Sequence, residues 1–166
     1  CKFDPDEVKS AYGVHDRDID EGFVEADRAV LPNRHLICIM HSGSYSPMFQ
    51  SLSYGSGKPS STLIPIGWPG VNPRLNVMPN GILTCVSGRG AYGHPQVTQV
   101  ALSLDGTANH WETPFAFHTG PGCSYTTTML RNDQLHVIYS HSDFNRNLGY
   151  HGLTSQSVNR SILQIE

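Results

Sequence analysis

The chain of 166 residues carries a net charge of −3, with 15% charged and 38% hydrophobic residues and no cluster of lysine and arginine. Clustered basic side chains bind nucleic-acid backbones, so this composition argues against a nucleic-acid partner and favours a small or neutral polar ligand. No apolar run approaches the ~20 residues of a membrane-spanning helix, and 16 glycines and 11 prolines are typical of short strands joined by frequent turns.

A polar turn followed by a short apolar run occurs three times in the sequence. The copies are LPNRHLICIM at 31–40, MPNGILTCVS at 78–87 and the looser LRNDQLHVIY at 130–139. Their asparagines, Asn33, Asn80 and Asn132, are separated by 47 and 52 positions. A period of about 50 residues is typical of repeat architectures whose units bury their faces against one another. We therefore expect function where successive repeats meet.

In chain order, residues 1–20 are expected to form an extended lead-in, followed by units at 21–68, 69–120 and 121–166. Short apolar and β-branched runs between Gly, Pro and Asn turns predict strands within each unit. The predicted strands are 23–30, 36–40 and 48–53; 74–77, 82–87, 97–103 and 113–118; and 124–129, 134–139, 148–153 and 162–165. Four short strands per unit make the blade of a β-propeller, so the predicted fold class is all-β. A β-sandwich with coincidental repeats is the competing interpretation.

Three blades do not close a ring, because propellers contain about four to eight. The 166 residues are therefore expected to be part of a larger ring, with the missing blades upstream in the same protein. Cys38 and Cys85 occupy the same place in two copies of the repeat and are expected to be buried free thiols in equivalent strands. The nine histidines show no metal-ligand spacing, so neither a metal nor another cofactor is predicted.

The segment from Ser103 to Thr107, followed by Trp111, resembles the Asp-box turn of sialidases and related propellers, with an insertion before the tryptophan. An aspartate accepts hydrogen bonds from turn amides, a glycine supplies a positive φ, and a tryptophan can seal the hairpin against the blade. The resemblance therefore implies that Ser103, Asp105, Gly106 and Trp111 are structural residues.

The string GCSYTT at 122–127, ahead of LHVIY at 135–139, resembles the last catalytic blade of the exo-sialidase family. In that family the tyrosine of such a string is the nucleophile, which implies this role for Tyr125 and a place near the substrate for Tyr139. Glu25 opens the stretch 25–31 just before the Pro-Asn turn, where sialidases carry the glutamate that activates the tyrosine. Tyrosine nucleophiles are an exception to the two-carboxylate rule of glycoside hydrolysis.

The sequence departs from the family where substrate-binding arginines are expected. Sixteen residues after the glutamate the family has an arginine that binds the sialic acid carboxylate, and this chain has His41, which lacks the guanidinium fork. No arginine stands in or just before the predicted strand 97–103, although Arg89 resembles that of sialidase-like bacterial proteins with a Gly-Arg-Pro-Gly motif. Arg74 is expected to pair locally or to line the same mouth. The first family arginine and the acid/base aspartate belong to upstream blades.

The resemblance covers residues 21–145 and implies about half of a six-bladed ring, with a secreted or periplasmic location. It implies a glycoside hydrolase of sialidase type, or a relative acting on another sugar, that is complete only in the longer protein. An enzyme would hold the Tyr125 hydroxyl and the Glu25 carboxylate in one polar pocket. A carbohydrate-binding propeller would keep the pocket without the pair, and a structural or protein-interaction propeller would need neither.

Overall fold

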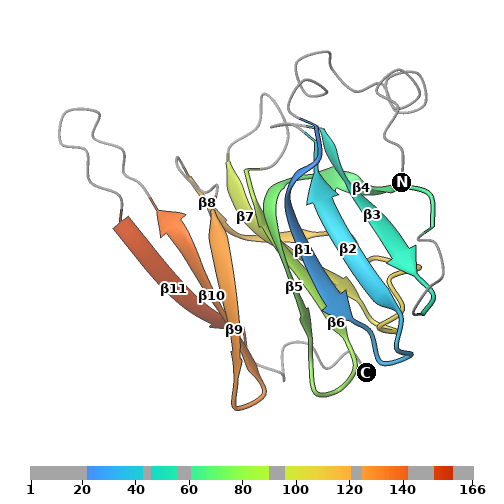
Figure 1. The fold of residues 1–166 in the computed structure, drawn as a ribbon. Helices are drawn as coiled ribbons and strands as arrows, with labels where there is room; N and C mark the ends of the chain where they lie inside the picture. The colour runs from blue at the N-terminus through green and yellow to red at the C-terminus, as the bar shows by residue number, and fades with distance from the viewer. Residues whose placement is uncertain are drawn as a thin grey trace.

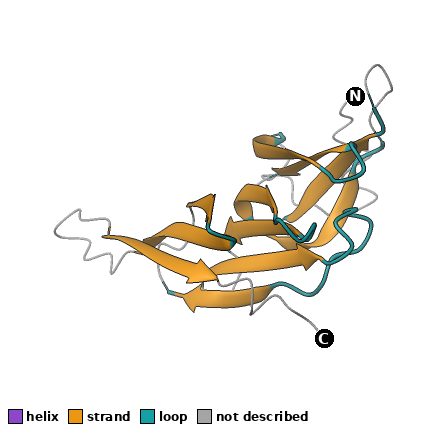
Figure 2. Ribbon diagram, turned by 90° about the horizontal axis from the view of Figure 1, so that it is seen from below, coloured by secondary structure: helices purple, strands orange, loops and turns teal. Residues whose placement is uncertain are grey.

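The structure is a computed structural model, and it describes residues 22–42, 46–55, 61–89, 96–120, 125–141 and 152–158. These residues form strands, turns and loops without a helix, so none of them lies in a helix that could cross a membrane (Figure 2). The strands are β1 (Val24–Val30), β2 (Leu36–His41), β3 (Pro47–Ser53), β4 (Ile64–Pro69), β5 (Val71–Val77), β6 (Leu83–Gly88), β7 (Val97–Ser103), β8 (Phe115–Thr119), β9 (Thr126–Arg131), β10 (Gln134–His141) and β11 (Gly152–Val158).

The strands form three antiparallel sheets, and within each sheet the neighbouring strands follow one another in the chain (Figure 1). The first sheet has the order β1-β2-β3-β4, the second β5-β6-β7-β8, and the third β9-β10-β11. A four-stranded meander of this kind is a propeller blade. The structure confirms the predicted all-β class, while the predicted lead-in at 1–20 and the predicted strand at 162–165 lie outside the described residues.

Two strands differ from the prediction. β4 was not predicted, because its sequence IPIGWP contains two prolines and a glycine. It forms at the edge of its sheet, where a proline does not remove a ladder hydrogen bond from the sheet interior. The strand predicted at 148–153 overlaps β11, which pairs with β10 from Gly152 to Val158, and its residues 148–151 lie outside the described residues. The weakly apolar sequence of β11 does not mark its own bounds, which are set by the pairing.

The first two copies of the repeat form the same turn. The Asn33 Oδ1 accepts a hydrogen bond from the His35 N–H at 3.0 Å, and the Asn80 Oδ1 accepts one from the Ile82 N–H at 3.3 Å. In the third copy, Asn132 and Asp133 both have positive φ and directly link two paired strands as a two-residue hairpin. This shorter turn explains why the third copy matches the others only loosely.

The three sheets pack through two hydrophobic clusters. One cluster joins the first and second sheets and the other joins the second and third. In β6 the side chains of Leu83 and Cys85 belong to the first cluster, while that of Val86 belongs to the second. Successive side chains of a strand point to opposite faces, so the second sheet is buried on both faces.

This packing corrects the prediction for the cysteines. Cys85 is fully buried, and burial raises the pKa of its thiol well above the ordinary value. Cys38 is only half-buried, because in β2 it points away from the face that carries buried Ile37 and Ile39. The prediction of two equally buried thiols is therefore wrong for Cys38, although the two strands are equivalent in sequence.

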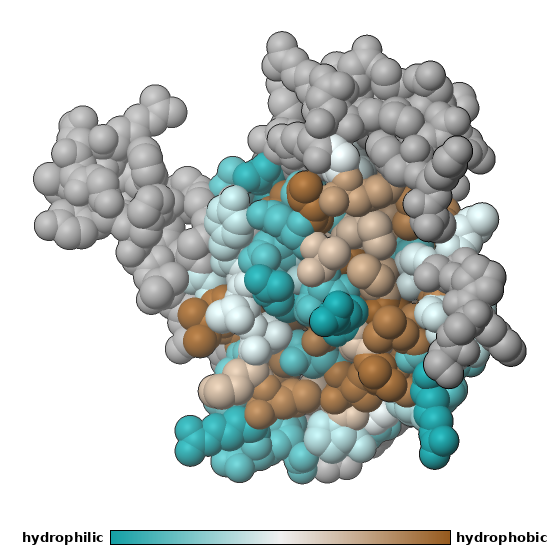
Figure 3. Space-filling model, viewed as in Figure 1, coloured by the Kyte–Doolittle hydropathy of each residue, from teal (hydrophilic) through white to brown (hydrophobic). Residues whose placement is uncertain are grey.

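The first strand of each sheet is an edge strand, and β1, β5 and β9 lie side by side in the molecule (Figure 1). The face seen in this view carries polar and hydrophobic side chains interspersed with one another (Figure 3). These three strands, which we call the inner strands, are where the successive repeats meet.

Candidate functional site

Two inner strands begin with the same irregularity. The pairing of β1 with β2 shifts between Val24 and Asp27, and that of β5 with β6 shifts between Val71 and Arg74. Inside each bulge one residue other than glycine has a positive φ, Glu25 at 49° and Asn72 at 50°. These two residues are 47 positions apart, the same interval as the repeat. Bulges re-aim side chains and are over-represented next to active sites, so this end of the inner strands is a candidate site.

Glu25 is held through one of its two carboxylate oxygens. Its Oε2 accepts a hydrogen bond from the backbone N–H of Asn72 at 3.0 Å and lies 3.3 Å from the Nδ1 of His41. His41 is placed there because it pairs with Val24 across β1 and β2, and its side chain is only 5% exposed, against 29% for that of Glu25. The two side chains form an ion pair whenever the imidazole is protonated.

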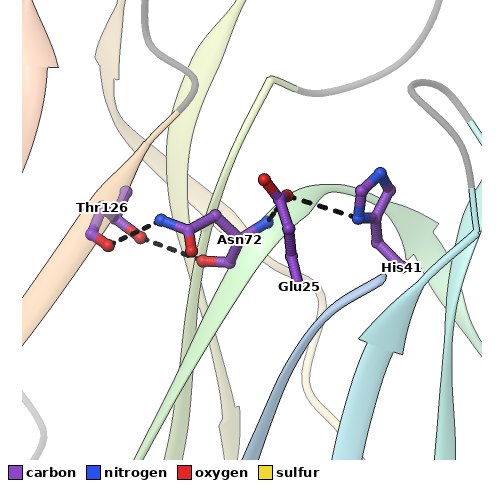
Figure 4. A network of polar contacts seen from close by, with 4 residues as sticks. All are labelled: Glu25, His41, Asn72 and Thr126. Carbon is purple, nitrogen blue, oxygen red and sulfur yellow. Dashed lines mark hydrogen bonds and ion pairs between the residues drawn. The ribbon is translucent and has the colours of Figure 1, made fainter. Parts of the chain in front are cut away.

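The next contacts lead to the third sheet. The backbone carbonyl of Thr126 accepts hydrogen bonds from the Asn72 Nδ2 at 2.8 Å and from the Arg74 Nε at 3.2 Å. The Thr126 hydroxyl donates in return to the Asn72 carbonyl at 3.3 Å. Figure 4 shows this network running from His41 through Glu25 and Asn72 to Thr126. It joins all three inner strands, and Tyr125 immediately precedes its last member.

The structure thus brings Glu25, His41 and Arg74 together at one end of the inner strands. Tyr125 is 57% exposed and immediately precedes β9, so it is joined in the chain to Thr126 of this network. Asn72 and Thr126 were not among the predicted site residues. The signal that would have pointed to Asn72 is its 47-residue interval from Glu25, whereas nothing in the sequence alone marks Thr126.

The other two predicted substrate contacts lie differently. Arg89 has a positive φ of 79° just beyond β6, is half-buried, and donates its backbone N–H to the Val97 carbonyl at 2.9 Å. Tyr139 is 1% exposed, and its ring packs against Phe117 and His118 with centroids 5.7 and 4.8 Å away. Its side chain therefore belongs to the core between the second and third sheets.

The turn after β7 is built around the carboxylate of Asp105. Its Oδ1 accepts from the Ser103 hydroxyl at 2.8 Å and from the Thr107 N–H at 3.0 Å, and its Oδ2 accepts from the Thr107 hydroxyl at 2.8 Å. The backbone hydrogen bond from Thr107, with the side-chain bonds, holds the pKa of the Asp105 carboxyl below its ordinary value. Ser103 pairs with Leu83, at the opposite end of the second sheet from Asn72.

Trp111 fastens this turn to the first sheet. Its Nε1 donates to the Gln50 Oε1 at 2.9 Å, the Gln50 Nε2 donates to the Ala108 carbonyl at 2.9 Å, and its ring packs edge-on against Trp68 at 5.6 Å. The turn therefore stabilises the packing of two sheets far from the candidate site.

Asp105→Asn is expected to lower the melting temperature most at neutral pH and progressively less below pH ~4. A depressed carboxyl pKa in the folded state contributes stability above the pKa of the unfolded chain, and this contribution is lost as the pH falls through the folded pKa. Asparagine does not titrate, so the wild type approaches the variant in acid. Thermal melts of both proteins from pH 7 to pH 3 measure this, and a difference that does not change with pH would contradict it.

No group of three or more His, Cys, Asp and Glu side chains that would hold a metal ion occurs within the described ranges. What the site offers is a carboxylate tied to an imidazole, an asparagine that spans two sheets, an arginine, and a nearby phenol. A carboxylate and a phenol that come within hydrogen-bond reach of each other are suited to proton transfer and nucleophilic attack.

No family model matches the sequence, and no curated protein matches it. Among solved structures, the chain is similar to the GH93 α-L-arabinofuranosidase of Fusarium graminearum in complex with arabinobiose, with a TM-score of 0.64 and 17% sequence identity. The match covers 89% of this chain and 48% of that one, so the chain spans about half the length of the enzyme. At this identity the likeness concerns the fold, and together with the three successive antiparallel sheets it shows that the chain has the all-β fold of propeller blades.

Proposed function

We propose that the protein is a glycoside hydrolase that removes a terminal sugar at the end of the inner strands, with Tyr125 as nucleophile and Glu25 as its base. The observation that carries this proposal is the asymmetry of the Glu25 carboxylate. Both of its contacts, with Asn72 and His41, are made by Oε2. Its Oε1 has no protein partner in the part of the chain that the structure describes, so this oxygen is available to accept a proton.

The chemistry requires such an oxygen. A phenol has an unperturbed pKa of ~10 and is a weak nucleophile at neutral pH unless a base takes its proton during attack. In the proposed reaction the Tyr125 oxygen bonds to the anomeric carbon while its proton passes to Glu25 and the glycosidic oxygen leaves with a proton from an acid. In the second step the deprotonated acid takes a proton from a water molecule, whose oxygen bonds to the anomeric carbon, and the departing tyrosine oxygen takes its proton back from Glu25.

Further blades of the same ring supply the acid and the remaining substrate contacts. Three sheets do not close a propeller, and the chain spans 48% of the solved enzyme that shares its fold. Within the present chain, Arg74 uses its Nε on the Thr126 carbonyl, and its terminal nitrogens have no protein partner among the described residues. These nitrogens are donors for hydroxyl groups of the sugar.

The terminal sugar that the enzyme removes is either a sialic acid or a neutral sugar. His41 stands where sialidases carry a carboxylate-binding arginine, and it faces Glu25. A single imidazole cannot form the bidentate pair that a guanidinium makes with a carboxylate. The solved enzyme of the same fold was captured with arabinobiose, a neutral sugar. We therefore propose a neutral terminal sugar as the substrate, with a sialoside as the alternative.

The test is hydrolysis of aryl glycosides by the full-length protein between pH 4 and pH 8, with α-L-arabinofuranosides, neutral hexosides and α-sialosides in the panel. Turnover of a neutral glycoside is expected. Turnover of the sialoside alone would keep the mechanism and correct the specificity. Sugar binding in calorimetry without turnover would contradict the proposal in favour of a carbohydrate-binding propeller, and the lack of both would favour a structural one.

A further inference from the structure

We infer that Asn72 is a positioning residue that holds the base and the nucleophile segment in register across three sheets. This inference rests on the proposed function, because it concerns how Glu25 and Tyr125 act as a pair. Asn72 is the one residue of the network that contacts both sides. Its backbone N–H reaches the Glu25 carboxylate, and its side-chain amide reaches the backbone of Thr126, the residue after Tyr125.

The two contacts of Asn72 depend on a single backbone conformation. A φ of 50° is sterically unfavourable for most residues, and asparagine is one of the few that adopt it readily. In this conformation the N–H of Asn72 points at β1 while its side chain extends toward β9 (Figure 4). Asn72 is 7% exposed, and its bond to Thr126 is buried and shielded from competition with water, while its bond to Glu25 is partly buried.

The contact between Asn72 and Thr126 is reciprocal. Asn72 donates through Nδ2 to the Thr126 carbonyl, and its own carbonyl accepts from the Thr126 hydroxyl. Two bonds in opposite directions fix both the distance and the rotation of the start of β9 relative to β5. Because Tyr125 is covalently attached at this point, its position relative to Glu25 is set through Asn72.

The chain contains a matched contact for comparison. Four residues along the same strand, the Asn76 Nδ2 donates to the Thr128 hydroxyl at 2.7 Å and so joins the same two strands. Asn76 does not contact Glu25, and it lies beyond the bulge. Removing either side chain costs one link between the second and third sheets, but only the loss at position 72 loosens the end of β9 next to Tyr125. The bond from the Thr126 hydroxyl to the carbonyl of residue 72 and the bond from Arg74 to Thr126 remain there.

The experiment uses the full-length protein with Asn72→Gly and Asn76→Ala. Glycine keeps the positive φ and the N–H bonded to Glu25, and removes only the amide that reaches Thr126. Small displacements of catalytic groups cost up to about 10²-fold, so kcat is expected to fall by about 10- to 100-fold in Asn72→Gly with little change in KM. In Asn76→Ala kcat is expected to stay within about twofold, although both variants melt at lower temperature. Equal kcat in the two variants would overturn the inference.

A second measurement does not depend on turnover. Glu25→Gln is expected to shift the ring resonances of isotopically labelled Tyr125 in the wild-type background and in Asn76→Ala, and to leave them in place in Asn72→Gly. The comparison of Glu25→Gln in the wild type and in Asn72→Gly is a double-mutant cycle, and it reports the coupling of the Glu25 and Asn72 side chains. A shift of the same size in all three backgrounds, or no shift in any of them, would overturn the inference. A shift confined to backgrounds with Asn72, in a protein that hydrolyses no glycoside, would support the positioning role and refute the proposed reaction.

Discussion

Tyr125→Phe is expected to lower kcat by at least about 10³-fold, because the substitution removes the oxygen that bonds to the anomeric carbon and leaves the ring in place. Tyr125 is 57% exposed and lies outside the two clusters that join the sheets, so the melting temperature should change by no more than about 2 °C. The affinity for a non-hydrolysed sugar should change by no more than about tenfold, the value of one neutral hydrogen bond. Steady-state kinetics on the best aryl glycoside and calorimetric titration measure both quantities.

Tyr54→Phe is the matched control. Tyr54 is also an exposed tyrosine, but it follows β3 and packs its ring against His35 at 4.9 Å, at the end of the first sheet opposite Glu25. Its substitution should leave kcat unchanged. Undiminished turnover in Tyr125→Phe would remove the tyrosine mechanism and leave Glu25 to act on a water molecule.

Gly106→Ala is expected to destabilise the fold by about 3 kcal/mol, the largest effect on stability that we predict. Gly106 has a positive φ of 66°, and a methyl group added to it would clash with the backbone carbonyl oxygen of Gly81 in the neighbouring turn. Backbone atoms cannot move aside as a flexible side chain can. The cost of the left-handed conformation, about 1–2 kcal/mol, is therefore increased by the cost of separating the two turns.

Gly81→Ala separates the cost of the left-handed conformation from the cost of moving the two turns apart. Gly81 also has a positive φ, 88°, but a methyl group added there would meet no atom within 4 Å. Its substitution should cost only the conformational term, about 1–2 kcal/mol. Urea unfolding of the two variants and the wild type gives both values, and an equal loss in the two variants would show that the contact between the turns adds nothing.

The fold was predictable from the sequence because its signals are local. Each hairpin turn lies between the strands that it joins. The turn at Asn33 and its repeat at Asn80 therefore predicted two strands in each of two sheets before any pairing was known. The burial of Cys38 was not predictable in this way. Its strand is equivalent in sequence to that of Cys85, but the number of sheets packed against a strand is a property of the assembled fold.

The site was predictable only in part for a related reason. Glu25 and Tyr125 were proposed through resemblance, and His41 through its departure from that resemblance. Asn72 was missed because its role depends on contacts with residues 47 and 54 positions away in two other sheets. No local pattern of polarity distinguishes such an asparagine from one that caps a turn.

The carboxylates of β1 also protect an edge of the second sheet. As an edge strand, β5 has backbone N–H groups that do not bond to β6, and unpaired groups of this kind are a template for pairing with a strand of another chain. The N–H of Asn72 donates to Glu25, and that of Leu75 donates to the Asp27 Oδ2 at 2.8 Å. Glu25 and Asp27 thus occupy two N–H donors that a foreign strand would need. The Glu25 carboxylate, which we assign to proton transfer, therefore also hinders edge-to-edge aggregation.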